Sequence, residues 1–467
     1  MSQSIVNLIE HCEACGVHLY EEAGALRYYS EQPELPEHIR EAARREKTRL
    51  LDHLAQPDPL TSELSGLRQA YWLGEHSVFS EGGAAYLHLV YAGDIPAQQA
   101  LQEAWQRVVL LHPILGYTLD AESPRFKLMP AGPGRVERVG AHAGHPPHRC
   151  AALGEGPPVA ALSAGQALVR LVLVEGQGQR CLHVVYRLAL FDAPSVQIFI
   201  NDLAAMLRDP GYRPCVSSGY RADVVAGRGR AQRLARFKAR HYWHERVATL
   251  AAGPDLPRER RRSTTAQPGR FTEHRMPLQA AQVQALRSQA RTHHVSLNAV
   301  LLTVYLQTLA RWSGVASVTC SVMYSNRAAL GQAVQGCLGN HSDTVLIDLP
   351  TAQTSFGDRV RLLQQDLHAA MQHSAYDGTS TVREWIRLHD TRASSAEPPM
   401  PYVFSSLLDM QLAPAAFEQV DHTMMTPQIW IDAQAFEQDS VLWLTWDERE
   451  GIFEEGVIAE AFQAYCD

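Results

Sequence analysis

The sequence predicts a mixed α/β fold in which a small N-terminal unit precedes two larger lobes. First, 467 residues are too many for a single hydrophobic core. Second, strand-like apolar runs such as YLHLVYAG, LVRLVLVEG and VLWLTW alternate with helical ones. Third, QPDPLTS at residues 56–62 and STTAQPGR at residues 263–270 have linker composition. These stretches divide the chain into units of residues 1–57, 63–265 and 266–467.

Composition and charge exclude several classes of protein. Hydrophobic residues make up 46% and charged residues 20% of the chain, which is typical of globular proteins. A net charge of −8 argues against nucleic acid as a partner. Of the basic clusters at residues 228–240 and 258–262, the first has helical spacing, so a solvated helix face is preferred over a phosphate-binding patch. No apolar run reaches the roughly 18 residues of a membrane span, and the N-terminus lacks a signal-peptide layout. We therefore expect a cytoplasmic protein without nucleic-acid or membrane partners.

The cysteines and histidines give no metal-binding pattern. Eight cysteines spread along the chain indicate a reducing compartment rather than a disulfide framework. The close pair Cys12 and Cys15 has no two further ligands at zinc-site spacing, so we interpret both as helical thiols. The three histidines of a Pro/Gly-rich loop, His142, His145 and His148, have no carboxylate nearby in the sequence. The sequence therefore predicts no metal site.

Residues 1–55 form a self-contained pattern. SIVNLIEHCEACGVHL carries one apolar helical stripe, which predicts a helix that ends at Gly16. A second helix is expected from Pro36 to Leu54. Between them, VHLYEEAGALRYYS is typical of a β-hairpin that turns near Gly24. A unit this small has little core, and its hairpin edge can accept a strand from another chain. A docking module is the preferred interpretation, with a helical cap on the next domain as the alternative.

This segment resembles, over nearly all of its length, the tubulysin-type docking domains at the amino end of some nonribosomal peptide synthetase subunits. The resemblance implies that the hairpin captures the C-terminal peptide of an upstream synthetase subunit. Arg27, Tyr28 and Tyr29 would lie on or beside that surface. It also implies that this unit can form a dimer, as in some relatives.

From residue 63 to the end, the order of motifs resembles the heterocyclisation domains of nonribosomal peptide synthetases, a branch of the condensation-domain family. The motifs are ELSGLRQAYWLGE, ARHYWHERVATLAAGPDLP, HVSLNAVLLTVYLQTLARWSG, VMYSNRAAL, PYVFSSLL, MMTPQIWID and LTWD. The ordered set carries the resemblance, since no single motif is specific. It implies two chloramphenicol-acetyltransferase-like lobes in a V-shaped fold, and we expect the active site between them.

The resemblance also implies the reaction. An acyl or peptidyl thioester on an upstream carrier protein is condensed with cysteine, serine or threonine on a downstream carrier protein. The side-chain nucleophile then closes onto the new amide, and loss of water gives a thiazoline or oxazoline. No cofactor binds directly, because the phosphopantetheine arms of the carrier proteins deliver both substrates.

The residues that match the cyclodehydration pair of this family are Asp447 and Thr426. Asp447 follows the strand VLWLTW, whose tryptophans can exclude water and raise the carboxyl pKa toward the range useful for acid–base catalysis. Thr426 precedes a proline, which favours an extended backbone that can hold the hydroxyl toward the cleft. Asn326, Ser406 and Gln428 would add polar contacts to an oxyanion or amide.

The family signature D-x4-D-x2-S reads here Arg187-x4-Asp192-x2-Ser195, so a cation replaces the first acid. The resemblance implies that Asp192 is a structural partner of an arginine elsewhere. A buried Arg187 needs a carboxylate partner, and Asp192 is one candidate. Otherwise its guanidinium must extend into the substrate tunnel that the resemblance implies, toward a pantetheine phosphate or an acidic substrate. The opening motif also departs from the family, with Arg68 in place of a glutamine and Glu75 in place of an arginine.

Three functions are compatible with these patterns. The preferred one is heterocyclisation, and the others are a divergent condensation-type enzyme without ring formation and an inactive platform for docking and carrier binding. QHSAYDG at residues 372–378 satisfies the H-x3-D-G pattern of ordinary condensation domains, but it lies far from the Asp192 segment where that signature belongs. His373 is therefore not expected to be a catalytic base. Because no adenylation or carrier segment is present, we expect a fragment of a longer synthetase.

Overall fold

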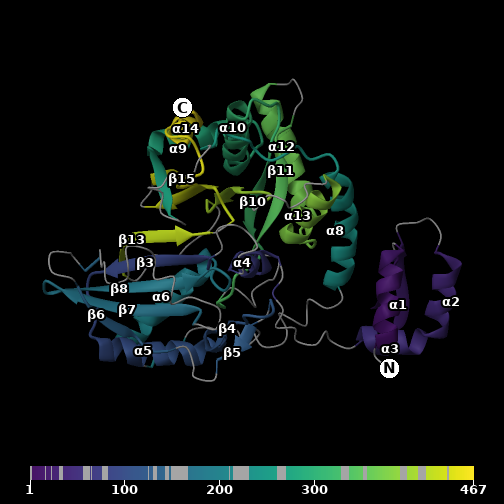
Figure 1. Ribbon diagram of the computed structural model, residues 1–467, viewed down its shortest axis with the longest axis horizontal. Helices are drawn as coiled ribbons and strands as arrows, with labels where there is room; N and C mark the ends of the chain where they lie inside the picture. Colours follow the sequence, from purple (N-terminus) through teal and green to yellow (C-terminus); the bar gives the residue numbers. More distant parts are fainter. Residues whose placement is uncertain are drawn as a thin grey trace.

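The structure is a computed structural model with an N-terminal unit beside two larger lobes (Figure 1). It describes residues 3–15, 17–22, 24–30, 35–55, 64, 66–75, 83–124, 126–129, 134–141, 147–148, 167–209, 211–213, 231–259, 270–327, 336–350, 355–389, 397–408, 417–426, 428–438 and 441–467. None of the helices in these ranges combines the length and apolar character that crossing a bilayer demands.

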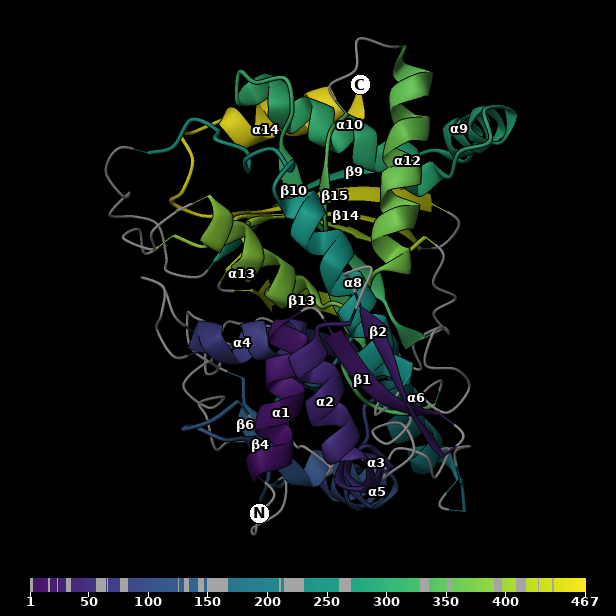
Figure 2. The ribbon, with the colours of Figure 1, turned by 90° about the vertical axis from the view of Figure 1, so that its right-hand side faces the viewer.

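The N-terminal unit packs three helices on a hairpin, in front of the N-terminal lobe in Figure 2. The hairpin is antiparallel and pairs Val17 with Ser30 across the turn at Gly24, as predicted. The predicted second helix is split at Glu46, which lets Ile39 and Leu50 pack in the same small core. The elements are α1 (Gln3–Ala14), β1 (Val17–Glu22), β2 (Ala25–Ser30), α2 (Glu37–Arg45) and α3 (Lys47–Ala55).

The N-terminal lobe is a five-stranded sheet in the order β13-β3-β8-β7-β6, in which β13 (Glu418–Met425) comes from the C-terminal part of the chain. Helices α5 and α6 pack together in the same lobe (Figure 1). Its core includes a cluster of aromatic rings, Trp105, Tyr186, Phe191 and Phe199, in edge-to-face contacts. The elements are α4 (Leu67–Glu75), β3 (Tyr86–Ala92), α5 (Gln98–Leu111), the 3-10 helix η1 (Pro113–Gly116), β4 (Tyr117–Leu119), β5 (Phe126–Leu128), β6 (Glu137–Gly140), β7 (Val169–Gly176), β8 (Gln179–Arg187) and α6 (Ala193–Arg208).

The C-terminal lobe is a six-stranded mixed sheet in the order β11-β10-β12-β14-β15-β9. Helices α10 and α14 cover one face of this sheet (Figure 2), where Tyr305 and Tyr465 contact Trp446. The elements are α8 (Ala231–Val247), β9 (Phe271–Leu278), α9 (Ala280–Thr292), α10 (Leu297–Trp312), β10 (Thr319–Ser325), β11 (Ser342–Asp348), α12 (Phe356–Gln372), α13 (Gly378–Leu388), β12 (Tyr402–Ser406), β13 (Glu418–Met425), β14 (Ile431–Gln438), β15 (Val441–Arg449) and α14 (Val457–Cys466).

The predicted buried helix is α10. The Ser296 hydroxyl accepts a hydrogen bond from the Ala299 N–H and caps the first turn, as the sequence indicates. Beyond its end, Gly314 has a φ of 67°, a left-handed conformation that glycine adopts without strain. The side chains that pack inward include Leu302, Leu306 and Leu309.

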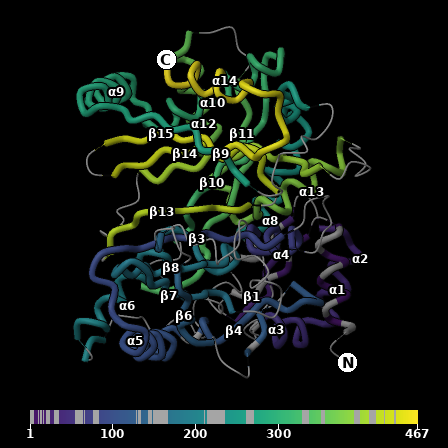
Figure 3. Tube along the Cα trace, turned by 60° about the vertical axis from the view of Figure 1, so that its left-hand side comes forward, coloured from purple at the N-terminus to yellow at the C-terminus, as the bar shows by residue number. Residues whose placement is uncertain are grey.

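Two elements connect the lobes. Strand β13 comes from the C-terminal part of the chain but pairs with β3 in the N-terminal sheet, and Figure 3 shows it between the strands of the two lobes. Helix α4 of the N-terminal lobe is held by two residues of the C-terminal part of the chain. Gln428 Nε2 donates to the Ala70 carbonyl at 2.8 Å, and Thr379 Oγ1 donates to the Gly66 carbonyl, just before the helix, at 2.9 Å. The cleft between the lobes is therefore bounded by backbone that belongs to both.

Gly378, the first residue of α13, lies very close to the backbone of β11. A Cβ atom on Gly378 would lie 2.5 Å from the carbonyl oxygen of Thr344, a backbone atom that cannot move without moving the strand. We expect Gly378→Ala to destabilise the protein by about 1–3 kcal/mol. Gly357→Ala near the start of α12 is the matched control, because a Cβ atom there has nothing closer than 4.0 Å. Equal melting temperatures for the two variants would contradict this close packing.

Candidate active site between the lobes

Three carboxylates lie side by side across the C-terminal sheet. Asp447 on β15 is opposite Asp432 on β14 and opposite Glu273 on β9. Residues directly opposite in antiparallel strands share a face of the sheet, so the three form an acid row. The neighbouring residue Trp446 packs on the other face, against α10. Because side chains alternate along a strand, the acid row faces away from the helices.

The acid row faces strand β13. His422 on β13 lies 3.2 Å from Glu273, with its Nε2 next to the carboxylate. Since β13 belongs to the N-terminal sheet, this contact places the row at the junction of the two lobes, as Figure 3 shows for the strands themselves. The candidate active site thus lies between the lobes.

Burial brings the pKa values of two members of the row toward neutral pH, and that of Asp447 is the higher. Burial raises the pKa of Asp447 to about 7, and the charges of Asp432 and Glu273 act in the same direction. Burial also raises the pKa of Asp432 to about 6, against hydrogen bonds from Ser405 and Gln434 that lower it. The hydrogen bond from His422 lowers the pKa of Glu273. Asp447 is therefore suited to act as both acid and base.

An amide bridges two carboxylates of the row. Gln434 Nε2 donates to Asp447 Oδ2 at 3.0 Å and to Asp432 Oδ2 at 3.2 Å. The Ser405 hydroxyl donates to Asp432 Oδ1 at 2.9 Å. These bonds fix the orientation of the Asp447 carboxyl. We did not predict Gln434, Asp432 or Ser405, although the polar–apolar alternation of IDAQA indicates that the first two share a face.

Thr426 lies just after β13 and lines a cavity of about 130 Å³. Its hydroxyl is buried and has no hydrogen-bond partner within the described part of the chain. Such a group costs about 1–3 kcal/mol when it stays unpaired, so it favours a ligand that completes the bond. Tyr71 lines the same cavity, and burial together with the charge of Asp432 raises its pKa.

The other predicted site residues take different positions. Gln428 lines the Thr426 cavity and holds α4, as described above. Ser406 donates to Asn298 Oδ1 at 2.6 Å and so faces α10, opposite to Ser405. Asn326 is half-buried at the end of β10, where its backbone N–H donates to the His341 carbonyl at 2.8 Å. The structure thus brings Thr426 and Gln428 together, and places Ser406 on the helix side of the sheet.

The second acid of the signature joins the lobes. Arg327 binds Asp192 through two hydrogen bonds, Nε to Oδ2 at 2.9 Å and Nη2 to Oδ1 at 2.8 Å. Asp192 also caps α6 by accepting from the Ser195 N–H at 3.0 Å. The Ser195 hydroxyl bonds to the carbonyl of Gly339 on the other lobe at 2.9 Å. Burial would raise the pKa of Asp192, but Arg327 outweighs it and lowers the pKa. The pairing matches the structural role implied for Asp192.

Arg187 is fully buried and forms an ion pair with Glu75 on α4. The Glu75 side chain is only 7% exposed. Of the two expected arrangements, the structure therefore shows pairing with a carboxylate, and the partner is Glu75 rather than Asp192. The pair lies within the N-terminal lobe and attaches α4 to the end of β8.

His373 is engaged in packing. Its ring stacks on Tyr242 at 4.1 Å between ring centroids, and its Nδ1 lies 2.8 Å from the Ala369 carbonyl. The aspartate of the same pattern, Asp377, caps helix α13. Both contacts agree with leaving His373 out of the catalytic residues.

The predicted docking residues are partly described. Arg27 and Tyr28 are exposed on β2, with Tyr28 52% exposed. The backbone of Tyr29 pairs with that of His18, but its side chain lies outside the described residues. His142 and His145 of the histidine-rich loop also lie outside them.

The chain belongs to the condensation-domain family, since residues 161–398, about half of its length, match the model of the condensation domain. Pyochelin synthetase PchF of Pseudomonas aeruginosa is 28% identical over 99% of this chain and 26% of the relative. Phenyloxazoline synthase MbtB of Mycobacterium bovis is 27% identical over 86% of this chain and 29% of the relative. The chain thus spans about a quarter of the length of these curated relatives.

Solved structures share the fold. The EpoB cyclization-docking bidomain from Sorangium cellulosum has a TM-score of 0.74 at 23% sequence identity, covering 99% of this chain and 97% of that chain. The nonribosomal peptide synthetase FmoA3 has a TM-score of 0.71 at 25% identity over 88% of this chain and 42% of that chain. The first match extends over the N-terminal unit as well as both lobes.

Breaking the Asp192–Arg327 pair should destabilise the protein strongly. Arg327→Ala leaves a buried carboxylate without its cation, which costs about 3–5 kcal/mol. Arg361→Ala is the control, because it removes an exposed ion pair with Asp358 and should cost at most about 1 kcal/mol. Thermal unfolding of both variants distinguishes the two cases. Equal losses would contradict a joining role for Arg327.

The raised pKa of Asp447 predicts a pH-dependent stability. An unfolded aspartate has a pKa of about 3.9, so folding binds a proton and stability falls as pH rises toward about 7. Asp447→Asn removes this penalty. The melting temperature of the variant minus that of the unmodified protein should therefore increase as the pH rises from 5 to 8. A difference that is constant over this range would contradict the raised pKa.

Proposed function

We propose that this chain is the docking and heterocyclisation part of a nonribosomal peptide synthetase. It condenses an acyl or peptidyl thioester on an upstream carrier protein with cysteine, serine or threonine on a downstream one, and cyclodehydrates the product. The observation that carries this proposal is Asp447, a carboxyl with a pKa of about 7 at the junction of the lobes. The names of two relatives support it, since MbtB is a phenyloxazoline synthase and the EpoB structure is a cyclization-docking bidomain.

Ring closure needs proton transfers in both directions. The thiol or hydroxyl attacks the amide carbon and loses its proton, which gives a cyclic intermediate that carries a hydroxyl. The ring nitrogen then loses its proton while the hydroxyl leaves as water, and the C=N bond of the thiazoline or oxazoline forms. A carboxyl with a pKa near the working pH can accept the thiol or hydroxyl proton and pass it to the amide oxygen, which becomes the hydroxyl of the intermediate. It can then accept the ring-nitrogen proton and pass it to that hydroxyl, which leaves as water. Asp447 has this property.

The neighbouring groups have supporting roles. Gln434 holds the Asp447 carboxyl in one orientation. The hydroxyl of Thr426, which has no hydrogen-bond partner among the described residues, can donate to the amide oxygen on which negative charge develops, or accept from the ring nitrogen. Gln428 fixes α4 against the cavity in which Thr426 lies. We keep Asn326, half-buried at the end of β10, among the polar residues that support substrate binding. Ser406 faces α10, on the side of the sheet away from the acid row, so we assign it no contact with the substrate.

The altered signature fits an active enzyme. The family pattern has an acid where Arg187 stands and an arginine where Glu75 stands, so both charges are reversed. Their buried ion pair supports an exchange in which the two residues swapped charge and kept the contact. Asp192 still binds Arg327, and burial still raises the pKa of Asp447 to about 7. The exchange therefore does not indicate loss of function.

The partners follow from the same proposal. Phosphopantetheine arms of upstream and downstream carrier proteins would bring the substrates to the cleft between the lobes. The C-terminal peptide of an upstream subunit would bind the hairpin beside Arg27 and Tyr28, both exposed, and Tyr29. We also propose that the N-terminal unit forms a dimer and that the protein is cytoplasmic. The longer synthetase implied by the relatives' length would supply the remaining domains.

Intact mass of the downstream carrier protein tests the function. The chain is incubated with a loaded acyl donor and with cysteinyl, seryl or threonyl acceptors. We expect acyl transfer followed by loss of one water, and Asp447→Asn should lower the water-loss step by about 100-fold or more. Asp421→Asn, an exposed acid on β13, is the control. Transfer without water loss would indicate a condensation enzyme, and no transfer with carriers that bind would indicate a platform.

The charge exchange can be reversed in the protein. Glu75→Arg and Arg187→Glu each place two like charges in a buried contact, so each should cost about 3–5 kcal/mol. The double variant restores opposite charges and should recover more than half of the loss of either single variant. Melting temperatures and product mass report this recovery. A double variant as unstable as the singles would refute the exchange.

A further inference from the structure

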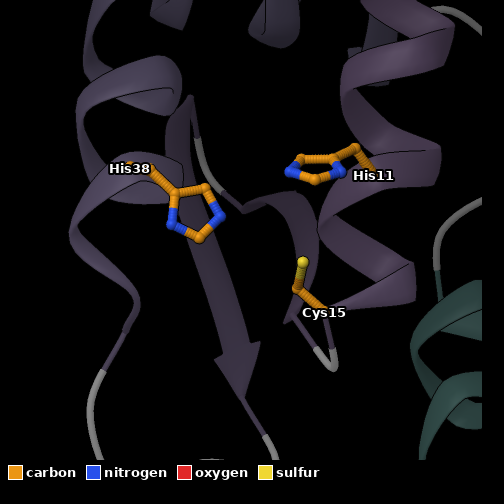
Figure 4. A group of neighbouring side chains, drawn as sticks. All are labelled: His11, Cys15 and His38. Carbon is orange, nitrogen blue, oxygen red and sulfur yellow. The ribbon is translucent and has the colours of Figure 1, made fainter.

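Three metal-binding side chains meet in the N-terminal unit. Cys15 directly follows the last residue of α1, one turn beyond His11, and its N–H donates to the His11 carbonyl; His38 lies near the start of α2. Their ligand atoms all lie within 4.8 Å of one another. Figure 4 shows the two imidazole rings and the sulfur atom around a common space, and the ring centroids are 5.6 Å apart. The three side chains therefore converge from two helices.

The donor set matches zinc chemistry. One thiolate and two imidazoles are ligands that zinc uses in tetrahedral sites, with a fourth position open to water. Bond lengths of about 2.0–2.3 Å to these atoms imply separations of about 3.3–3.6 Å between ligands. His11 and His38 are exposed and Cys15 is half-buried, so small side-chain rotations can close the remaining distance without disturbing the core. Soft sulfur and nitrogen donors disfavour magnesium and calcium.

Spacing in the sequence groups Cys12 with Cys15 as a candidate ligand pair, and the structure separates the surroundings of these two thiols. Cys12 is fully buried in the core of the unit, whereas Cys15 is turned toward the two histidines. The relevant spacing is His-x3-Cys at the C-terminal end of α1, where the Cys15 N–H donates to the His11 carbonyl and residues four apart share a face. His38 could not be recognised as the third ligand from spacing alone, because a hairpin separates it from α1.

We propose that His11, Cys15 and His38 bind one zinc ion, with a water molecule as the fourth ligand. The ion would tie together the two helices that flank the hairpin, since α1 ends just before β1 and α2 follows β2. The unit has a small core, so this cross-link adds stability where burial provides little. The proposed binding does not depend on the catalytic function of the lobes.

Cobalt and zinc titrations of the reduced, chelator-treated full chain test the proposal. We expect one equivalent of Co²⁺ to bind with a tetrahedral absorption spectrum and a thiolate charge-transfer band. One equivalent of Zn²⁺ should displace it and raise the melting temperature of the N-terminal unit. No saturable binding, or an octahedral spectrum without the charge-transfer band, would overturn the proposal.

Single substitutions assign the ligands. Cys15→Ser should abolish the charge-transfer band, and His11→Ala or His38→Gln should weaken affinity by about 100-fold or more, since changes outside the ligand shell alone cost about 10–100-fold. The exposed His38 keeps the test valid if the other variants unfold. Cys466→Ser and His53→Ala are matched controls on α14 and α3. Binding that persists in His38→Gln at unchanged affinity would exclude this site.

Discussion

The buried pair between Asp192 and Arg327 is the contact on which the arrangement of the lobes depends. It is bidentate, and the same guanidinium also donates to the Ser195 hydroxyl and to the carbonyls of Cys337 and Gly339. One cation thus connects the start of α6 to the backbone beside β10 and β11. A buried ion pair is stable only when its remaining polar atoms are satisfied, and here backbone groups of both lobes satisfy them.

With the lobes held together in this way, the acid row of the C-terminal sheet faces β13, the strand that pairs with β3 in the N-terminal sheet. β13 brings His422 to Glu273 beside Asp447, and this contact raises the pKa of His422 and lowers that of Glu273. Burial raises the pKa of Asp447, the charges of Asp432 and Glu273 on either side act in the same direction, and the charge of His422 opposes them. The catalytic property proposed for Asp447 follows from strand register and burial, so it depends on the relative position of the lobes.

Local patterns predicted much of the fold. The Ser296 cap and the Gly314 stop bounded α10 correctly, and the turn at Gly24 marked the hairpin. Motif order pointed to Asp447 and Thr426. The partners of these residues could not be predicted, because Asp432 and Glu273 become neighbours of Asp447 only through strand register. β13 was missed because its exposed, polar sequence EQVDHTMM contains little apolar alternation, and its pairing with β3 is remote in sequence.

The central claim is that Asp447 carries the proton transfers of ring closure, and the pH dependence of that single step tests it most directly. A carrier-bound, already condensed but uncyclised substrate isolates ring closure from amide formation. The account predicts a rate of water loss that changes with an apparent pKa near 7 and loses this dependence in Asp447→Asn. A rate that is flat between pH 5 and 8, or a profile unchanged by the substitution, would contradict it.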